Sequence, residues 1–386
     1  MNYAVTMLIA LIVAFISTPL VKKLAFKLGA VDIPKDERRM HKTPIALLGG
    51  AAIVFGFLIA LLYNIAAGAI LPDRSVAGML AGIFILLICG FLDDRFVLSW
   101  KVKALFQFAA AITYIIISDQ QIDFLTNPFV YDEVIDLIPL IAWPLTIFWI
   151  VGITNAINYI DGLDGLAAGV SCISALSLFF VSILSQGISE NPAAPLLTAA
   201  LAGAALGFLP FNFNPAKIFM GETGAAFLGF TLAVISIQGM LKSYAVISLA
   251  IPVLIIGFPI FDFAFATIRR IANKTSPACS DASHLHHKLI RMGLSQRQSV
   301  VLLYITSAVL GLCGFIFANK NYISAVILLI LLPVFVFAYA KYLVGDKQNP
   351  KNPGGAGADA DTALSAENKP ENTKPAISNR VDGRKA

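Results

Sequence analysis

The 386-residue chain carries little charge, because Asp, Glu, Lys and Arg together make up only 13% of it. Soluble globular chains carry roughly 25% charged residues, whereas 58% of this chain is hydrophobic. Its 28 basic and 23 acidic side chains are too few to cover a soluble surface. The composition excludes a cytosolic enzyme, a disordered regulator and a secreted disulfide scaffold, and it predicts a polytopic membrane protein.

Cysteine is scarce as well. The chain has four cysteines, and no two of them form a CxxC pair. Zinc sites and disulfide frameworks need cysteines in close, regular spacings. We therefore interpret these cysteines as reduced packing residues.

The first apolar segment, residues 3–21, lacks the basic flank that a secretory signal peptide needs. Its positive charges come afterwards, at Lys22, Lys23 and Lys27, so we interpret it as a membrane span with its N-terminus outside. A span needs about 20 mostly apolar residues. Eleven segments meet this criterion: 3–21, 45–71, 76–92, 103–118, 134–153, 165–186, 194–211, 224–241, 243–262, 298–317 and 322–343.

Eleven spans place the C-terminus inside, and the distribution of Lys and Arg supports this orientation. The loops that would then be cytosolic contain 17 Lys and Arg, whereas the outside loops contain 3. This is the bias of the positive-inside rule. The sequence thus predicts an all-α plasma-membrane protein with a membrane domain over 1–344. Residues 345–386 have almost no large apolar side chains and predict a disordered cytosolic tail.

The informative polar residues fall in the predicted cytosolic loops. The first loop, 29–50, contains a basic run with His41 and Lys42 and ends in a Gly pair. It is either an ordinary positive-inside loop or the rim of an anion-binding site. In the second loop, Asp93 and Asp94 end the third span, where acids oppose the helix macrodipole.

That unfavourable placement predicts a role for the pair in binding Mg²⁺ or as a general base, with solvated loop acids as the alternative. Lys103, ten residues further on, either snorkels to the interface or contacts phosphate. A third loop spaces oxygen-bearing side chains every three residues, which on a helix would gather them on one face. They are Asn155, Asn158, Asp161 and Asp164. Helix capping by Asp164 would explain one of them, but not all four.

The fourth cytosolic region pairs Glu222, which lies between glycines, with a cluster of three histidines: His284, His286 and His287. Zinc is one interpretation of the cluster, but the surrounding arginines and lysines favour a pyrophosphate ligand. Hard oxygen ligands predict Mg²⁺, and Mg²⁺ with basic residues predicts phosphoryl chemistry. We expect one soluble diphosphate substrate and one lipid phosphate.

Four pieces of the sequence, in order, resemble the polyprenyl-phosphate N-acetylhexosamine-1-phosphate transferase family: DDRFVLS, NAINYIDGLDGLAAG, NPAKIFMGETG and HLHH. The resemblance covers about residues 1–343. It implies that a sugar 1-phosphate passes from a UDP-sugar to undecaprenyl phosphate, which releases UMP. The HxHH and DGLDG forms resemble the branch that makes lipid-linked GlcNAc for teichoic acid, capsule or O-antigen.

The resemblance also implies a role for each matched residue. Asn158 and Glu222 hold Mg²⁺, for which Mn²⁺ is a substitute. Asp93 and Asp94 lie beside the metal, where one of them deprotonates or orients the lipid phosphate, and Asp161 is counted with these catalytic acids.

Lys103 is implied to contact phosphate, while Asp164 and Phe219 hold the uracil, Phe219 by stacking. The substrate-binding set is completed by Asn155, His41 and Lys42, and the diphosphate and sugar side is lined by His284, His286 and His287. One departure concerns Glu222, because the family usually has Asp there, in MGDTG. The extra methylene changes the reach of a ligand to Mg²⁺, an ion that demands near-octahedral geometry.

Other functions remain open. A phospho-MurNAc-pentapeptide translocase usually has HHH in place of HLHH, and an ion-coupled transporter would carry its charges in mid-span. A CDP-alcohol phosphotransferase would have DGxxAR, but Ala167 is followed by Ala168. The expected partners are a UDP-sugar, undecaprenyl phosphate and the lipid bilayer. A homodimer is an open alternative, and nucleic acid is not expected.

The topology makes a first testable prediction. A cysteine placed at Asp123 should react with an impermeant thiol reagent in intact cells, because the positive-inside bias puts that loop outside. A cysteine at Ala358 should react only after the membrane is opened. Labelling at Ala358 from outside would contradict the eleven-span topology.

Overall fold

The computed structural model describes residues 2–34, 43–126, 134–184, 193–240, 249–272, 285–319 and 321–348. Its helices in the first half of the chain are α1 (Tyr3–Leu28), α2 (Gly49–Ala66), α3 (Arg74–Phe96), α4 (Trp100–Ser118), α5 (Pro139–Ile160) and α6 (Leu166–Leu184). Those of the second half are α7 (Ala194–Asn212), α8 (Gly221–Met240), α9 (Ala250–Ile255), α10 (Gly257–Ala272), α11 (Leu285–Arg291), α12 (Gln296–Ala318) and α13 (Tyr322–Gln348).

Nine helices of the described chain are long and apolar enough to cross a membrane: α1 to α7, α12 and α13. The prediction of a polytopic helical membrane protein is confirmed. The other two predicted spans correspond to α8, which carries Glu222 and Gln238, and to the segment that the structure divides at Ile256 into α9 and α10. The chain divides into two units, residues 1–344 and residues 345–386.

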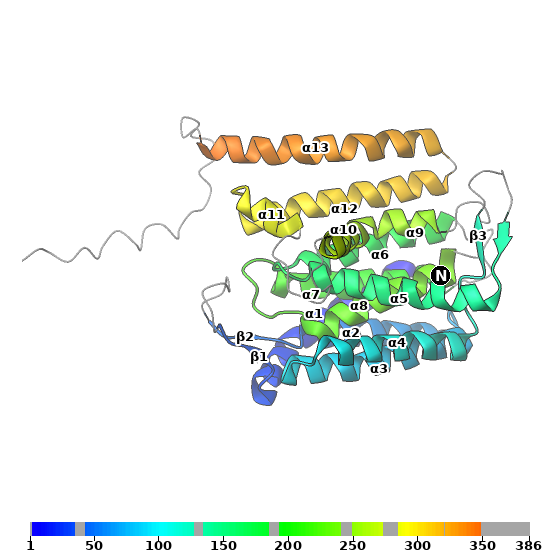
Figure 1. Cartoon of the computed structure of the whole chain (residues 1–386). Helices are drawn as coiled ribbons and strands as arrows, with labels where there is room; N and C mark the ends of the chain where they lie inside the picture. Colours follow the sequence, from blue (N-terminus) through cyan, green and yellow to red (C-terminus); the bar gives the residue numbers. More distant parts are fainter. Residues whose placement is uncertain are drawn as a thin grey trace, which may run out of the picture. The chain divides into compact units, whose positions relative to one another are not determined.

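Two short antiparallel ribbons, which the sequence did not predict, join helices of the bundle. β1 (Val31–Asp32) pairs with β2 (Ile45–Ala46), and β3 (Phe124–Thr126) pairs with β4 (Val134–Asp136). The two ribbons lie at opposite ends of the helices (Figure 1). The β1–β2 ribbon therefore identifies the end that carries the predicted cytosolic loops.

α8 forms the centre of the bundle. Its residues 223–238 are buried, and it contacts α2, α3, α5, α6 and α7. Glycines permit the closest approaches: a Cβ on Gly50 would collide with the Cα of Gly224, and one on Gly90 would collide with the Cα of Thr223. α2 and α3 thus meet the first turn of α8 backbone to backbone, as small residues allow in membrane helices.

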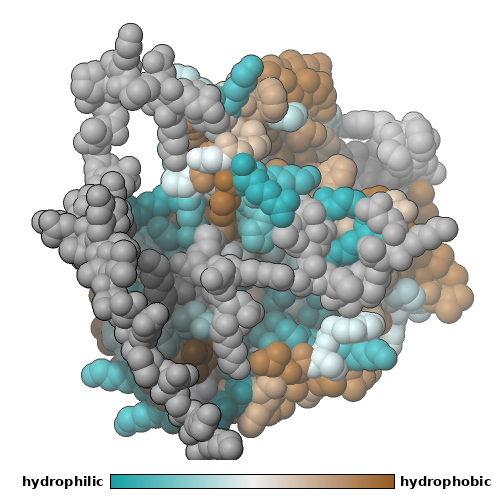
Figure 2. All heavy atoms as spheres, turned by 60° about the vertical axis from the view of Figure 1, so that its left-hand side comes forward, coloured by the Kyte–Doolittle hydropathy of each residue, from teal (hydrophilic) through white to brown (hydrophobic). Residues whose placement is uncertain are grey.

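The β1–β2 end of the bundle is polar, while the flanks of the helices are apolar. In Figure 2, hydrophilic residues gather over the centre of this end and hydrophobic residues lie around it. Exposed side chains of α1, α3 and α13 on the flanks include Ile16, Phe84 and Phe337. This distribution suits helices whose sides contact lipid and whose ends contact water.

Candidate active site

Lys103 joins two acids from different helices at the polar end. Its Nζ lies 3.0 Å from Asp93 Oδ2 and 2.9 Å from Glu222 Oε2. Asn158, in the last turn of α5, donates from Nδ2 to the same Glu222 oxygen at 2.8 Å. One carboxylate oxygen of Glu222, on α8, therefore accepts hydrogen bonds from both α4 and α5. The Glu222 side chain is only 8% exposed.

The two adjacent acids of α3 have different surroundings. Asp94 accepts three hydrogen bonds from the first turn of α8: from Glu222 N (2.8 Å), Thr223 N (3.3 Å) and Thr223 Oγ1 (2.7 Å). The approach is close because Gly221 has φ +73° and no Cβ, an atom that would fall 2.6 Å from Asp94 Oδ1. Asp94 thus caps α8, where a carboxylate also suits the helix dipole.

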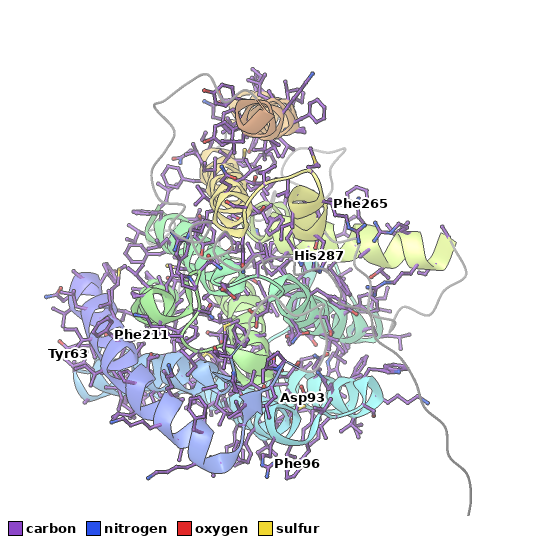
Figure 3. All side chains as sticks on the ribbon, turned by 90° about the vertical axis from the view of Figure 1, so that its left-hand side faces the viewer. Tyr63, Asp93, Phe96, Phe211, Phe265 and His287 are labelled. Atoms are coloured by element: carbon purple, nitrogen blue, oxygen red, sulfur yellow. The ribbon has the colours of Figure 1, made fainter. Side chains whose placement is uncertain are left out.

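Asp93 uses one oxygen to accept from the Leu98 N–H at 2.8 Å, which holds the turn after α3. Its other oxygen faces Lys103. Figure 3 looks at this end of the bundle, where Asp93 and His287 are both labelled. Asp93 thus differs from Asp94 in that one of its oxygens lies against the Lys103 ammonium group and neither binds the first turn of α8.

The third predicted motif is only half helical. α5 ends at Ile160, Asp161 is its C-cap, and Asp164 lies in the turn before α6. Gly165, with φ +80°, ends this turn directly before α6 begins at Leu166. The predicted single helix face therefore holds for Asn155 and Asn158, while the two acids project from the turn.

A cavity of about 660 Å³ opens beside this turn. Asp161, Asp164 and Phe219 line it together with His287, and Asp32 and Thr43 of the first predicted cytosolic loop contribute as well. The volume falls within the range of small-molecule sites. The structure thus brings the predicted nucleotide residues Asp164 and Phe219 to one cavity.

Burial raises the pKa of Asp161 well above its usual value, and the nearby carboxylates of Glu222, Asp94 and Asp164 raise it further. Because the folded-state pKa lies above the unfolded one, the folded protein binds the proton more strongly than the unfolded chain. Stability is therefore lost as the pH rises through the folded-state pKa. An ionised Asp161 adds to a local excess of negative charge.

Two of the predicted histidines, His286 and His287, lie beside this turn. His286 is 1% exposed and packs under Gly162, where a Cβ would come within 2.6 Å of its Nε2. His287 stacks beside it, with ring centroids 4.3 Å apart, and lines the cavity. Across the described parts of the chain, no three His, Cys, Asp or Glu side chains gather closely enough to form a protein-only metal cage.

Some predicted residues are not brought to the cavity, and others lie outside the described residues. Asn155 donates from Nδ2 to Gln107 Oε1 on α4 (2.7 Å) and to the Val151 carbonyl within α5 (2.8 Å). These two bonds account for both amide hydrogens of Asn155. It does not line the cavity. Outside the described residues lie His41, Lys42 and His284.

The sequence analysis missed several polar residues that hold this site. Asn214 donates to Asp164 Oδ2 (3.0 Å) and to Gln296 Oε1 (2.8 Å). Asn212 accepts from Gly165 N (3.1 Å), and Tyr304 donates to the Gly165 carbonyl (2.6 Å). Asn214 is the first residue of the NPAKIFMGETG motif and Asn212 lies two residues before it, which was a usable signal. Nothing local in the sequence distinguishes Gln296 or Tyr304.

The cluster holds more acidic than basic side chains. Asp93, Asp94, Asp161 and Glu222 converge here, and Lys103 is the one cation that the described residues pair with them. Mg²⁺ is commonly held by one or two carboxylates plus substrate phosphates rather than by an all-protein cage. The oxygen donors of Asn158 and Glu222 fit that mode of binding.

A comparison with protein families agrees with this chemistry. The model of glycosyl transferase family 4 matches residues 76–240, the segment that contains the acids, Lys103 and Glu222. Full-length relatives of this family extend over most of the chain. The chain belongs to glycosyl transferase family 4, the polyprenyl-phosphate N-acetylhexosamine-1-phosphate transferases, and is a phosphoglycosyl transferase.

Three relatives show the extent of the similarity. A Bacillus subtilis (strain 168) protein described as a probable undecaprenyl-phosphate N-acetylglucosaminyl 1-phosphate transferase is 39% identical over 348 residues, covering 90% of this chain and 94% of that protein. A decaprenyl-phosphate N-acetylglucosaminephosphotransferase of Mycobacterium tuberculosis is 35% identical, covering 83% and 84%. The undecaprenyl-phosphate alpha-N-acetylglucosaminyl 1-phosphate transferase of Escherichia coli (strain K12) is 29% identical, covering 82% and 84%.

The different surroundings of the two α3 acids generate a prediction. Asp94→Asn should destabilise the protein by about 2 kcal/mol more than Asp93→Asn, because hydrogen bonds to a charged group contribute roughly 1.5–3 kcal/mol and Asp94 accepts three. The measurement is thermal unfolding of both variants in detergent, followed by circular dichroism. Equal loss of stability would show that Asp94 does not hold the start of α8.

Proposed function

We propose that this protein transfers GlcNAc-1-phosphate from UDP-GlcNAc to undecaprenyl phosphate, giving undecaprenyl-diphosphate-GlcNAc and UMP. The observation that carries the proposal is the joining of two sites at one polar end: the Lys103–acid cluster and a cavity with nucleotide-sized volume. The names of the relatives support the choice of donor and acceptor. An oxygen of the lipid phosphate attacks the sugar-bearing phosphorus, and UMP leaves with the bridging oxygen.

In this proposal Lys103 binds a phosphate oxygen in the position where it now meets Asp93 and Glu222. Asp93 accepts a proton from the lipid phosphate or orients it, because its Oδ2 adjoins the Lys103 ammonium group that would bind the same phosphate. Asp94 acts through α8 by fixing the backbone of Glu222. Asp94 is thus a positioning residue.

Asn158 and Glu222 hold Mg²⁺, or Mn²⁺ in its place. When bound, the ion neutralises the diphosphate of the sugar nucleotide, and in phosphoryl transfer such charge stabilisation supplies much of the rate. Glu222 meets Lys103 and Asn158 through the same oxygen, Oε2. The longer side chain thus reaches partners on α4 and α5.

The nucleoside occupies the other part of the cavity. Both hydrogen bonds given to the Asp164 carboxylate, from Asn214 Nδ2 and Ala216 N, go to Oδ2, so Oδ1 is left to accept from the N3–H of uracil. Phe219 lines the same cavity and offers a ring for stacking. His287 lies on the diphosphate and sugar side.

We further propose that the polar end of the bundle faces the cytosol, with eleven spans, the N-terminus outside and a cytosolic tail after residue 344. The positive-inside bias supports this orientation. A soluble sugar nucleotide would then enter from the cytosol, and the lipid phosphate would arrive from the inner leaflet. The product would serve a cell-envelope polysaccharide such as teichoic acid or O-antigen.

The direct test supplies membranes containing the full chain with undecaprenyl phosphate and sugar-labelled donors. Label from UDP-GlcNAc should enter the lipid fraction with release of an equal amount of UMP. Label from UDP-MurNAc-pentapeptide should stay in the aqueous phase. Incorporation of the pentapeptide label in place of GlcNAc would establish the translocase alternative, and incorporation of neither would contradict the proposal.

The unusual acid of the cluster gives a second prediction. Glu222→Ala should lower turnover at least about a hundredfold, or roughly 2.7 kcal/mol, because it removes charge stabilisation. Glu222→Asp should keep or raise the activity and lower the Mg²⁺ concentration needed, if the shorter acid is the better ligand. The readout is UMP release against Mg²⁺ concentration.

The exposed Asp119 at the far end of α4 provides a matched control. Asp119→Asn also removes one carboxylate, and its backbone conformation is one that Asn tolerates, so activity should be unchanged. If the Glu222→Ala enzyme is active and has ordinary Mg²⁺ dependence, Glu222 is not a ligand of the metal.

A further inference from the structure

The first turns of α12 hold the nucleotide end of the cavity, although no residue of α12 belongs to the four motifs. The helix begins with a capping box in which Ser295 and Gln298 satisfy each other, so its start is well fixed. Gln296 follows at the first helical position and lines the cavity. Tyr304 lies two turns further along the same helix.

Gln296 acts on Asp164 through Asn214. The Nδ2 group of Asn214 has two hydrogens, and it gives one to Asp164 Oδ2 at 3.0 Å and the other to Gln296 Oε1 at 2.8 Å. The neighbouring Arg297 donates from Nε to the Asn214 carbonyl at 3.0 Å. α12 therefore fixes both the side chain and the backbone of the residue that orients Asp164.

Tyr304 holds the backbone of Gly165, the residue that follows Asp164. Its hydroxyl donates to the carbonyl of Gly165 at 2.6 Å. Gly169 makes room for this contact, since a Cβ there would collide with the Tyr304 hydroxyl oxygen. Asn212, 2% exposed, accepts from the Gly165 N–H, so Gly165 is held at both its N–H and its carbonyl.

We propose that α12 sets the nucleotide selectivity of the enzyme, with Gln296 and Tyr304 as positioning residues that hold Asp164 in place as an acceptor for a uracil N3–H. Cytosine has a lone pair at that ring nitrogen, so a correctly placed carboxylate repels it. Selectivity built on a directed polar contact is lost when the contact shifts. The inference rests on the proposed function, because it assigns Asp164 to the uracil.

The test compares Tyr304→Phe and Gln296→Ala with wild type, using the full chain purified in detergent. Calorimetry gives the Kd of UDP and of CDP, and steady-state kinetics give KM and kcat with UDP-GlcNAc. Each variant should weaken UDP binding and raise KM by about three- to tenfold, as expected for one lost hydrogen bond. The preference for UDP over CDP should fall by a similar factor, with kcat nearly unchanged.

A matched control removes a hydroxyl elsewhere. Tyr342 lies on α13 and is 67% exposed, so Tyr342→Phe should leave every parameter unchanged. A double-mutant cycle adds a stricter criterion. In an Asp164→Asn background, Tyr304→Phe should change the Kd of UDP less than twofold, because the contact that it positions has been altered already.

The outcomes separate the two proposals. A wild-type protein that binds neither UDP nor UDP-GlcNAc would contradict the proposed function itself. A wild-type protein that binds UDP, with Tyr304→Phe and Gln296→Ala variants that keep the UDP affinity and the UDP preference, would overturn only the role of α12. If the only effect of Tyr304→Phe and Gln296→Ala is a lower melting temperature, the role of α12 in selectivity is likewise overturned, because both side chains then contribute to stability alone.

Discussion

The architecture depends on the electrostatic balance of a carboxylate cluster at one end of a membrane bundle. Asp93 and Glu222, from α3 and α8, meet the single ammonium group of Lys103, from α4. Carboxylates that are partly withdrawn from water are costly unless they are paired. The helices can bring them together because glycines allow the first turn of α8 to touch α2 and α3.

The charges of this cluster do not balance, and the imbalance makes the site suitable for a divalent cation. One lysine does not match the number of acids that gather here. The pKa of Asp161 is raised first by its burial and then by the neighbouring carboxylates. In the proposed function, a divalent cation would reduce this excess of negative charge and would supply positive charge for a diphosphate. The adjoining cavity would then take the nucleoside.

Much of the helical membrane architecture was predictable from the sequence, because membrane helices follow directly from length and apolar composition. The acids Asp93 and Asp94 were identified since they oppose a helix dipole, and the four side chains from Asn155 to Asp164 were identified by their three-residue spacing. The sequence could not reveal that Asp94 caps α8 while Asp93 faces Lys103. That difference depends on the approach of Gly221 from a helix more than 100 residues away.

Other features were also beyond local reasoning. The three-residue spacing from Asn155 to Asp164 predicted one helix face, but α5 ends at Ile160, before Asp161 and Asp164. Asn155 then pairs with Gln107 instead of lining the cavity. The roles of Gln296 and Tyr304 come from tertiary contacts across more than 80 residues, which periodicity and motif spacing do not contain.

The most direct test of the electrostatic account is the binding of Mn²⁺ to the purified full chain, followed by electron paramagnetic resonance with and without UDP. The account predicts a single Mn²⁺ site that Mg²⁺ displaces, that binds more tightly when UDP is present, and that is lost in Glu222→Ala but kept in Asp119→Asn. Binding of the ion and of UDP must strengthen each other equally. An Mn²⁺ affinity that is indifferent both to UDP and to Glu222 would contradict it.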